Sequence, residues 1–327
     1  MTFPAPFISV ERVCTLPYEI SADSLTVNPA IQSTMLQGGS FRAIGSNVLL
    51  KSQDGLNWRN LVANLRHDGS FYISSVIQLD SDQRIFARNK NGLNCYRWEE
   101  WDQVCKTVSP VTSPTPGVFS AWTDEGLVIV AKENPLTEIV CRESDTSDCP
   151  KWSVKLPGNV VHLQLSSSGI GLCAMWGTAE NLMNLESWSS AVYPTHDSGR
   201  NWLQVWTMDT MLLAGASVNQ TTTIVGGSDG VLAIVSHTGI QEYWREEGGD
   251  IVAVDALGFQ QIAVIESDDE AAVQRILWSE ESSEWRSYAV RFEERVQSVK
   301  LIGPEECLVC TRHTIYKCRL NEAPLMN

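Results

Sequence analysis

The sequence has few basic residues. Its 327 residues include 24 lysines and arginines against 39 aspartates and glutamates, which gives a formal net charge of −15. A negative surface repels the phosphate backbone of nucleic acids. We therefore expect no nucleic-acid partner and interpret the acidity as a source of solubility.

Long apolar runs are also missing. No stretch approaches the roughly 18 uninterrupted apolar residues that a membrane-spanning helix needs. The first residues, MTFPAPFISVERVC, lack the basic segment followed by an apolar segment that is typical of a signal peptide. We expect a soluble protein without a membrane partner, cytoplasmic rather than secreted.

Familiar catalytic motifs are absent as well. The sequence contains no GxSxG, no HExxH, no P-loop and no dinucleotide-binding fingerprint. Its five histidines are scattered without metal-ligand spacing, and the CxxC formed by Cys307 and Cys310 has no second pair. We predict no cofactor and no metal site, and we leave open whether the protein is an enzyme.

The nine cysteines permit two interpretations. Three pairs flank short segments that resemble hairpins, so each pair could face across two strands and form a disulfide in an oxidising compartment; these pairs are Cys95 with Cys105, Cys141 with Cys149, and Cys310 with Cys318. Free thiols in the core of a cytoplasmic protein are the alternative.

Short apolar runs rich in valine, isoleucine and leucine dominate the chain. They are separated by glycine, asparagine, aspartate and serine, which is the pattern of β-strands joined by turns; examples are 47–52, 126–132, 221–227, 230–236, 261–267 and 306–312. Helical apolar spacing is scarce. The chain is therefore expected to be all-β.

Tryptophan marks a repeat. Six tryptophans each close a polar turn and open a new strand, namely Trp58, Trp101, Trp152, Trp202, Trp244 and Trp285, and the steps between them are 43, 51, 50, 42 and 41 residues. That period matches one four-stranded blade of a β-propeller. We predict that residues 1–327 form a single propeller domain of seven blades, with six as the alternative.

The two ends of the chain are expected to share the last blade. Segments 296–303, 306–312 and 314–320 provide three strands after Trp285, and segment 7–16 provides a fourth. Closure of this kind removes exposed sheet edges.

Residues 195–202 read THDSGRNW, and residues 52–58 read SQDGLNW. Both resemble the Asp-box of sialidase-type and related propellers. In such a turn the Thr or Ser and the Asp hydrogen-bond the turn's own backbone, Gly takes positive φ, and Trp packs between neighbouring sheets. The motif predicts a fold, so we do not assign Asp54 or Asp197 a catalytic role. Segment 41–58 also resembles one blade of photosystem II assembly-factor propellers.

Candidate site residues follow from the expected fold. The first strand of each blade lines the central channel, and loops at one mouth form a pocket. Our assignment of first strands gives seven channel or mouth residues: Arg42, Tyr72, Trp122, His162, Trp206, Asp255 and Lys300. The chain also has more tryptophans than the blades require, which indicates either core packing or an aromatic pocket.

Three functions are compatible with these residues. The first is binding of a small organic molecule or glycan in a Trp-rich pocket, with Trp122, Trp206 and Asp255 as ligand-binding residues. The second is an enzyme without metal or nucleophile that catalyses a cyclisation or cycloaddition in specialised metabolism by holding its reactants in place. The third is an assembly scaffold whose acidic segments, 246–250, 266–270 and 280–284, meet a basic protein partner.

The compact, Trp-rich and cysteine-containing propeller is also loosely similar to the fungal hetero-Diels–Alderases, which join tropolone-derived quinone methides to terpenes. This resemblance implies catalytic roles for His162, Tyr72, Arg42 or Lys300, which would polarise the quinone-methide oxygen. It further implies that Trp122 or Trp206 stacks on the ring.

Overall fold

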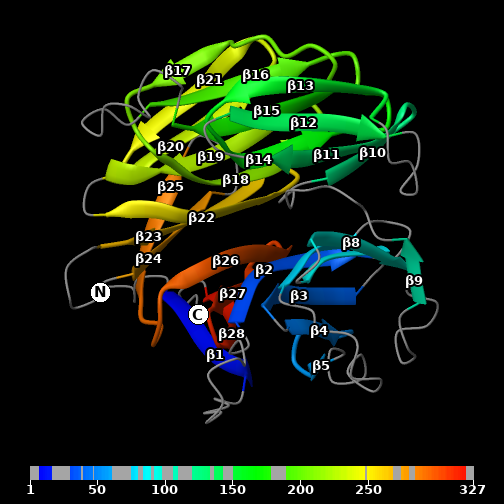
Figure 1. The fold of residues 1–327 in the computed structure, drawn as a ribbon. Helices are drawn as coiled ribbons and strands as arrows, with labels where there is room; N and C mark the ends of the chain where they lie inside the picture. The colour runs from blue at the N-terminus through cyan, green and yellow to red at the C-terminus, as the bar shows by residue number, and fades with distance from the viewer. Residues whose placement is uncertain are drawn as a thin grey trace, which may run out of the picture.

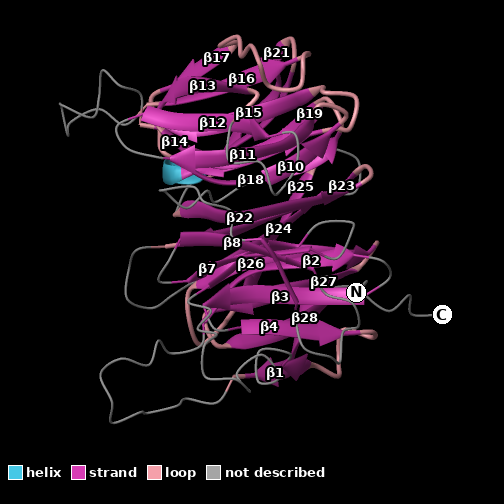
Figure 2. Ribbon diagram, turned by 45° about the vertical axis from the view of Figure 1, so that its right-hand side comes forward, coloured by secondary structure: helices cyan, strands magenta, loops and turns pink. Residues whose placement is uncertain are grey.

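The structure is a computed structural model of the 327-residue chain. It describes residues 7–16, 30–37, 40–46, 48–60, 75–79, 84–89, 92–97, 106–109, 120–132, 136–142, 150–177, 189–246, 249–267, 274–279 and 284–321. These residues form seven antiparallel sheets of four strands each (Figures 1 and 2). The all-β class and the count of seven blades are therefore confirmed.

Six sheets are built from four consecutive strands. The first contains β2 (Ala30–Gln37), β3 (Ser40–Ser46), β4 (Val48–Ser52) and β5 (Arg59–Asn60). The second contains β6 (Ser75–Leu79), β7 (Arg84–Asn89), β8 (Gly92–Arg97) and β9 (Lys106–Ser109). The third contains β10 (Ser120–Thr123), β11 (Gly126–Lys132), β12 (Leu136–Arg142) and β13 (Trp152–Pro157).

The next three sheets repeat this plan. The fourth contains β14 (Asn159–Leu165), β15 (Gly171–Trp176), β16 (Ser190–Thr195) and β17 (Trp206–Met208). The fifth contains β18 (Leu212–Asn219), β19 (Thr222–Gly227), β20 (Val231–Ser236) and β21 (Gly239–Arg245). The sixth contains β22 (Asp250–Leu257), β23 (Gln260–Glu266), β24 (Gln274–Ser279) and β25 (Trp285–Val290). A short 3-10 turn at Ser228–Gly230 joins β19 to β20.

The seventh sheet joins the two ends of the chain. Its order is β1-β28-β27-β26, from β1 (Phe7–Thr15), β28 (Thr314–Asn321), β27 (Glu306–Thr311) and β26 (Val296–Gly303). Phe7 is paired with Asn321 and Thr15 with Thr314, and Figure 1 shows β1 in blue beside the red C-terminal strands. The predicted closure is confirmed.

The first strands of successive sheets contact one another. β14 contacts β18, β18 contacts β22, β22 contacts β26, and β26 contacts β2. They therefore surround the channel, and the fourth strand of each sheet lies on the outside. The apolar core is correspondingly divided into clusters that each lie between two neighbouring blades.

The Thr195 and Ser52 turns have the geometry that the sequence predicts. In the Thr195 turn, Thr195 Oγ1 donates to Asp197 Oδ1 at 2.9 Å and accepts from Gly199 N at 3.1 Å, while Asp197 Oδ1 accepts from Asn201 N at 2.9 Å. Gly199 has φ 89°. The Ser52 turn repeats this pattern, with Gly55 N donating to Ser52 Oγ at 2.9 Å. Both turns connect the third strand of a blade to the fourth.

Hydrogen bonds of this kind also affect ionisation. The pKa of Asp54 lies well below its ordinary value because the backbone and side chain of Asn57, with the backbone of Leu56 and the hydroxyl of Ser52, stabilise the carboxylate. The carboxylate of Asp54 therefore stabilises the turn through hydrogen bonds to the turn's own residues. This geometry supports a structural role for Asp54, as the sequence indicated.

The strand register in the last blade differs from the predicted opposition of Cys310 and Cys318. In the last blade Cys307, rather than Cys310, lies opposite Cys318, and Cys310 is paired with Ile315. The predicted partner of Cys318 was wrong by three residues, because β27 and β28 are joined by a two-residue turn at 312–313, which sets Cys310 opposite Ile315. All three cysteines are buried, and none of them forms a disulfide; Cys105 and Cys149 lie outside the described residues.

Candidate functional site

The central channel contains a cavity of about 440 Å³. Four first strands supply its walls: β14, β18, β22 and β26. Its lining residues are Val161, His162, Leu213 to Ser217, Val252 to Asp255, and Gln297 to Lys300. We call this space the channel cavity.

A repeated backbone irregularity determines which side chains reach the channel. Six of the seven first strands pair out of register with the second strand near their beginning, in β2, β6, β14, β18, β22 and β26. A bulge places two residues opposite one, which re-aims the side chains around it. The residues skipped in four of these strands, Val161, Leu213, Val252 and Gln297, all line the cavity.

His162 follows directly after one of these bulges. Its Nε2 lies 3.3 Å from Ser217 Oγ on the neighbouring strand β18. Gly215 permits this approach, because a Cβ at that position would lie only 2.5 Å from His162 Cβ. A glycine inside a strand often marks such a close contact.

The environment keeps His162 neutral. Burial among the inner strands lowers the pKa of His162 to about 4, although a hydrogen bond with Gln164 acts in the opposite direction. At pH 7 the imidazole is therefore uncharged, with one nitrogen able to donate a hydrogen bond and the other able to accept one.

Asp255 and Lys300 form an ion pair across β22 and β26. Lys300 Nζ lies 2.8 Å from Asp255 Oδ1, and Leu301 N donates to Asp255 Oδ2 at 2.7 Å. Burial raises the pKa of Asp255, while Lys300 and the backbone amides oppose this effect. The pair therefore presents a fixed dipole to the cavity, with the ammonium more exposed than the carboxylate.

The structure brings three of the seven predicted site residues together: His162, Asp255 and Lys300 line one cavity. Trp122 lies in β10, a first strand as expected, but its side chain is not among those described. Tyr72 lies outside the described residues.

Two placements were wrong. Arg42 lies in β3, the second strand of its blade, because β2 precedes it. Trp206 lies in β17, the outermost strand, where it packs against the cluster between two blades. The described part of the cavity is lined by small, aliphatic and polar residues, so its lining is not the Trp-rich surface that we predicted.

Sequence analysis missed Gly215 and Ser217. The signal was present in the run of small residues in LLAGASVN, because small residues in a strand permit close approach of a neighbouring side chain. The described residues contain no group of three or more His, Cys, Asp or Glu side chains positioned to hold a metal ion.

Comparisons with known proteins support the fold. No protein-family model matches the chain, and no curated protein matches its sequence. The structure is similar to YCF48 from Cyanidioschyzon merolae, with 11% identity, a TM-score of 0.64, and coverage of 94% of this chain and 98% of that one. It is also similar to YCF48 bound to D1 peptide, with 11% identity, a TM-score of 0.61 and full coverage of both chains.

A streptogramin B lyase has the same fold, with 9% identity, a TM-score of 0.61, and coverage of 96% of this chain and 98% of that one. At these identities the likeness shows a β-propeller and nothing finer. The resemblances to Asp-box proteins and to hetero-Diels–Alderases stay predictions. No helix among the described residues has the length and hydrophobicity of a membrane span.

Proposed function

We propose that this protein is a β-propeller that binds a small polar organic molecule or glycan in the channel cavity. One observation carries the proposal: the neutral His162, the Ser217 hydroxyl and the Asp255–Lys300 pair face the same cavity. A cavity of about 440 Å³ falls within the size range of small-molecule sites.

The chemistry of the lining favours a hydroxylated or amide-bearing ligand. His162 and Ser217 can each donate and accept hydrogen bonds, and Lys300 can donate while it stays paired with Asp255. Removing a pair of charges from water costs desolvation free energy. Ionisable groups in such environments cluster at functional sites, which favours a binding role for the Asp255–Lys300 pair. The aliphatic residues between them, such as Val161 and Val252, would cover the apolar face of a sugar ring.

Native mass spectrometry tests this proposal. The wild-type protein and the variants His162→Gln and Ser217→Ala are incubated with a polar metabolite extract from the protein's own source, and the retained small-molecule mass is measured. Wild type should retain a defined mass, and both variants should lose most of it. His196→Gln, in an outer turn between β16 and β17, is the matched control and should retain the mass.

A wild-type protein that retains nothing from the extract contradicts the proposal. Equal retention by wild type and both channel variants contradicts it as well, because the ligand would then lie elsewhere. Thermal unfolding of each variant separates loss of the site from loss of the fold.

A protein-binding scaffold is the second candidate. Described parts of two acidic segments lie side by side at one end of the sixth blade, since Asp250 is paired with Glu266 and Gly249 lies against the carbonyl of Glu266. Of the third acidic segment, 280–284, only Glu284 lies among the described residues. A basic protein partner would therefore bind at this end of the sixth blade, near Asp250, and the structural likeness to a peptide-bound YCF48 is compatible with this.

The cyclisation or cycloaddition activity stays a prediction, because no described channel residue supplies the aromatic platform that it requires. We also propose that residues 1–327 form one propeller domain. The pairing of β1 with β28, which closes the ring through both ends of the chain, supports this proposal.

A further inference from the structure

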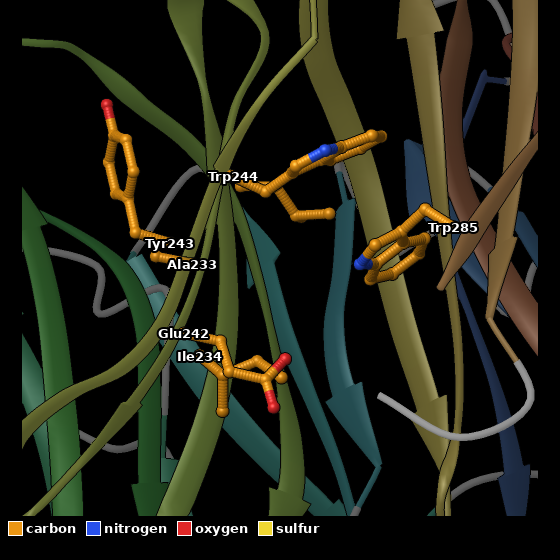
Figure 3. A pocket seen from close by; sticks show the side chains of 7 residues that line it. Ala233, Ile234, Glu242, Tyr243, Trp244 and Trp285 are labelled. Atoms are coloured by element: carbon orange, nitrogen blue, oxygen red, sulfur yellow. The ribbon is translucent and has the colours of Figure 1, made fainter. Parts of the chain in front are cut away.

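An open groove lies on the outside of the propeller, between the fifth and sixth blades. It has a volume of about 340 Å³ and is lined by residues 232–234 of β20, by Glu242, Tyr243 and Trp244 of β21, and by Trp285 of β25 (Figure 3). We call it the outer groove. It is separate from the channel cavity, which the innermost strands form.

Two indoles and a carboxylate face this groove. The rings of Trp244 and Trp285 are stacked, with centroids 5.7 Å apart and planes inclined by 15°. Glu242 lies two residues before Trp244 and points to the same side of β21, while Tyr243 points to the other side (Figure 3). Aromatic faces beside a carboxylate attract an organic cation.

The carboxylate of Glu242 is available to such a cation. Within the described part of the chain, Glu242 has no hydrogen-bond or ion-pair partner. Two neighbouring arginines form ion pairs with other carboxylates: Arg245 with Asp229, and Arg275 with Glu246.

Another interface of the same molecule shows which cation fits this arrangement. Between the third and fourth blades, Gly199 lies against the rings of both Trp152 and Trp202. Glu125 accepts a hydrogen bond from Trp152 Nε1 at 3.4 Å and pairs with Arg200, whose terminal nitrogen lies 2.7 Å away. At that interface a guanidinium of the chain itself neutralises the carboxylate beside the tryptophans.

Among the residues that the structure describes, the lining of the outer groove includes no equivalent of Arg200. Arg200 stands two residues before Trp202, whereas the residue two positions before Trp285 is Ser283, in the sequence SEESSEW, which contains no basic residue. We propose that the missing cation comes from a protein partner: an arginine-containing segment lies along β21 and inserts one guanidinium between Glu242 and the Trp244–Trp285 pair.

Three further observations define this partner. The net charge of −15 favours a basic segment. β21 is the last strand of its sheet, so an extended segment can lie along its outer edge. Ile240 and Tyr243 are 40% and 53% exposed on β21, so an extended segment along this strand would also contact apolar surface, with Tyr243 on the side away from Glu242. Arginine suits the site better than lysine because its planar group stacks on aromatic rings and binds a carboxylate with two hydrogen bonds.

Fluorescence anisotropy at physiological ionic strength tests the proposal with a defined probe. The probe is a capped, fluorescein-labelled pentapeptide with arginine at its second and fourth positions and glycine elsewhere. A twin peptide with citrulline at both positions has nearly the same shape without the charge. The arginine peptide should bind the full-length protein, and the citrulline peptide should bind at least about tenfold more weakly.

Matched variants locate the binding. Glu242→Gln should weaken binding about tenfold through loss of one charge-assisted pair. Glu305→Gln removes the same charge from an exposed site on another blade and should change affinity less than about twofold because salt screens it. Trp244→Phe, which preserves most of the packing, should weaken binding about threefold through a weaker cation–π contact.

Equal weakening by Glu242→Gln and Glu305→Gln would overturn the proposal, because binding would then follow net charge alone. Equal binding of the arginine and citrulline peptides would overturn it too. If a single capped arginine bound as tightly as the pentapeptide, the groove would take a small cation, and the assignment to a protein partner would be wrong. The channel variant His162→Gln should leave peptide binding unchanged, so failure of this proposal is distinguishable from failure of the proposed channel function.

Discussion

Two interfaces between neighbouring blades use a pair of tryptophans in different ways. At the Trp152–Trp202 interface, Arg200 and Glu125 form an ion pair across the two blades. At the Trp244–Trp285 interface the rings stack on each other, and Glu242 faces an open groove. The comparison shows that the tryptophan maintains the packing of the blades, whereas the residues around it decide whether the interface is closed or open to a partner.

The difference arises from a short stretch of sequence. The Thr195 turn is a complete motif, with Gly199 at positive φ and Arg200 after it. The turn before Trp285 contains neither a glycine nor an arginine. The blade forms without this motif, because β24 and β25 pair from Gln274 with Val290 to Ser279 with Trp285.

The largest expected effect is on stability. Trp202→Ala should cost about 3 kcal/mol of unfolding free energy and Trp244→Ala about 2 kcal/mol, since each leaves a cavity but one face of Trp244 already borders the groove. Urea denaturation of both variants measures the difference. A greater loss for Trp244→Ala would mean that the open interface contributes more to stability than the closed one.

A pH titration separates both interfaces from the channel. The folded pKa of His162 is about 4, below its ordinary value of 6.5, so the unfolded chain binds the additional proton between these values and stability falls as pH decreases from 6.5 to 4. We expect a loss of about 2 kcal/mol, after a discount for the partly exposed ring. Urea denaturation at several pH values should give a flatter profile for His162→Gln than for the wild type.

Both tryptophan variants retain His162 and should therefore keep the acid dependence of the wild type. A profile for Trp202→Ala that is as flat as that of His162→Gln would contradict the separation of channel and interface. It would show that the closed interface, and not the imidazole in the channel, is sensitive to acid.

Opening the closed interface should create a second binding site. Arg200→Ala leaves Glu125 beside Trp152 without its guanidinium, so the arginine pentapeptide should acquire a second, weaker site, about fivefold weaker than the outer groove. Its cost in stability should be at most about 1 kcal/mol because the ion pair is largely exposed. Anisotropy with Glu242→Gln combined with Arg200→Ala isolates the new site; no binding above that of Glu242→Gln alone would contradict the comparison.

Closing the open groove should have the smallest effect. Glu284→Arg places a guanidinium directly before Trp285 and should weaken binding of the arginine pentapeptide about threefold by competing for Glu242. Glu284→Gln is the control and should weaken binding less, since it removes a charge without supplying a competitor. Equal effects of the two variants on the measured anisotropy would show that the added arginine does not reach Glu242.

Sequence reasoning predicted the strands, the seven blades and the closure because these depend on local signals. Alternating apolar residues, polar turns and the Trp repeat give the strands and their order, and segments 296–303 and 306–312 match β26 and β27 closely. The hydrogen bonds of the Thr195 turn also follow from its own residues.

The site was only partly predictable. The steps between the marker tryptophans vary from 41 to 51 residues, so the first strand of a blade cannot be located by counting from the tryptophan. Arg42 and Trp206 were therefore predicted to lie at the channel, whereas the structure has them in the second and fourth strands of their blades. The bulges before His162 and Ala253 depend on hydrogen-bond register between two strands, which no single residue encodes. The pairing of His162 with Ser217 depends on contact between blades.

The closure of the ring also determines how the molecule would respond to force. Phe7 lies opposite Asn321, and the pairing continues along β1 and β28 to Thr15 and Thr314. A load applied between the two ends of the chain would act on the Phe7–Asn321 pair first and then on each pair in turn. The hydrogen bonds between β1 and β28 would then break one after another. In strands that are loaded in shear along their length, many hydrogen bonds must break together. The blade that holds the ring together is thus the mechanically weakest when the molecule is pulled by its ends.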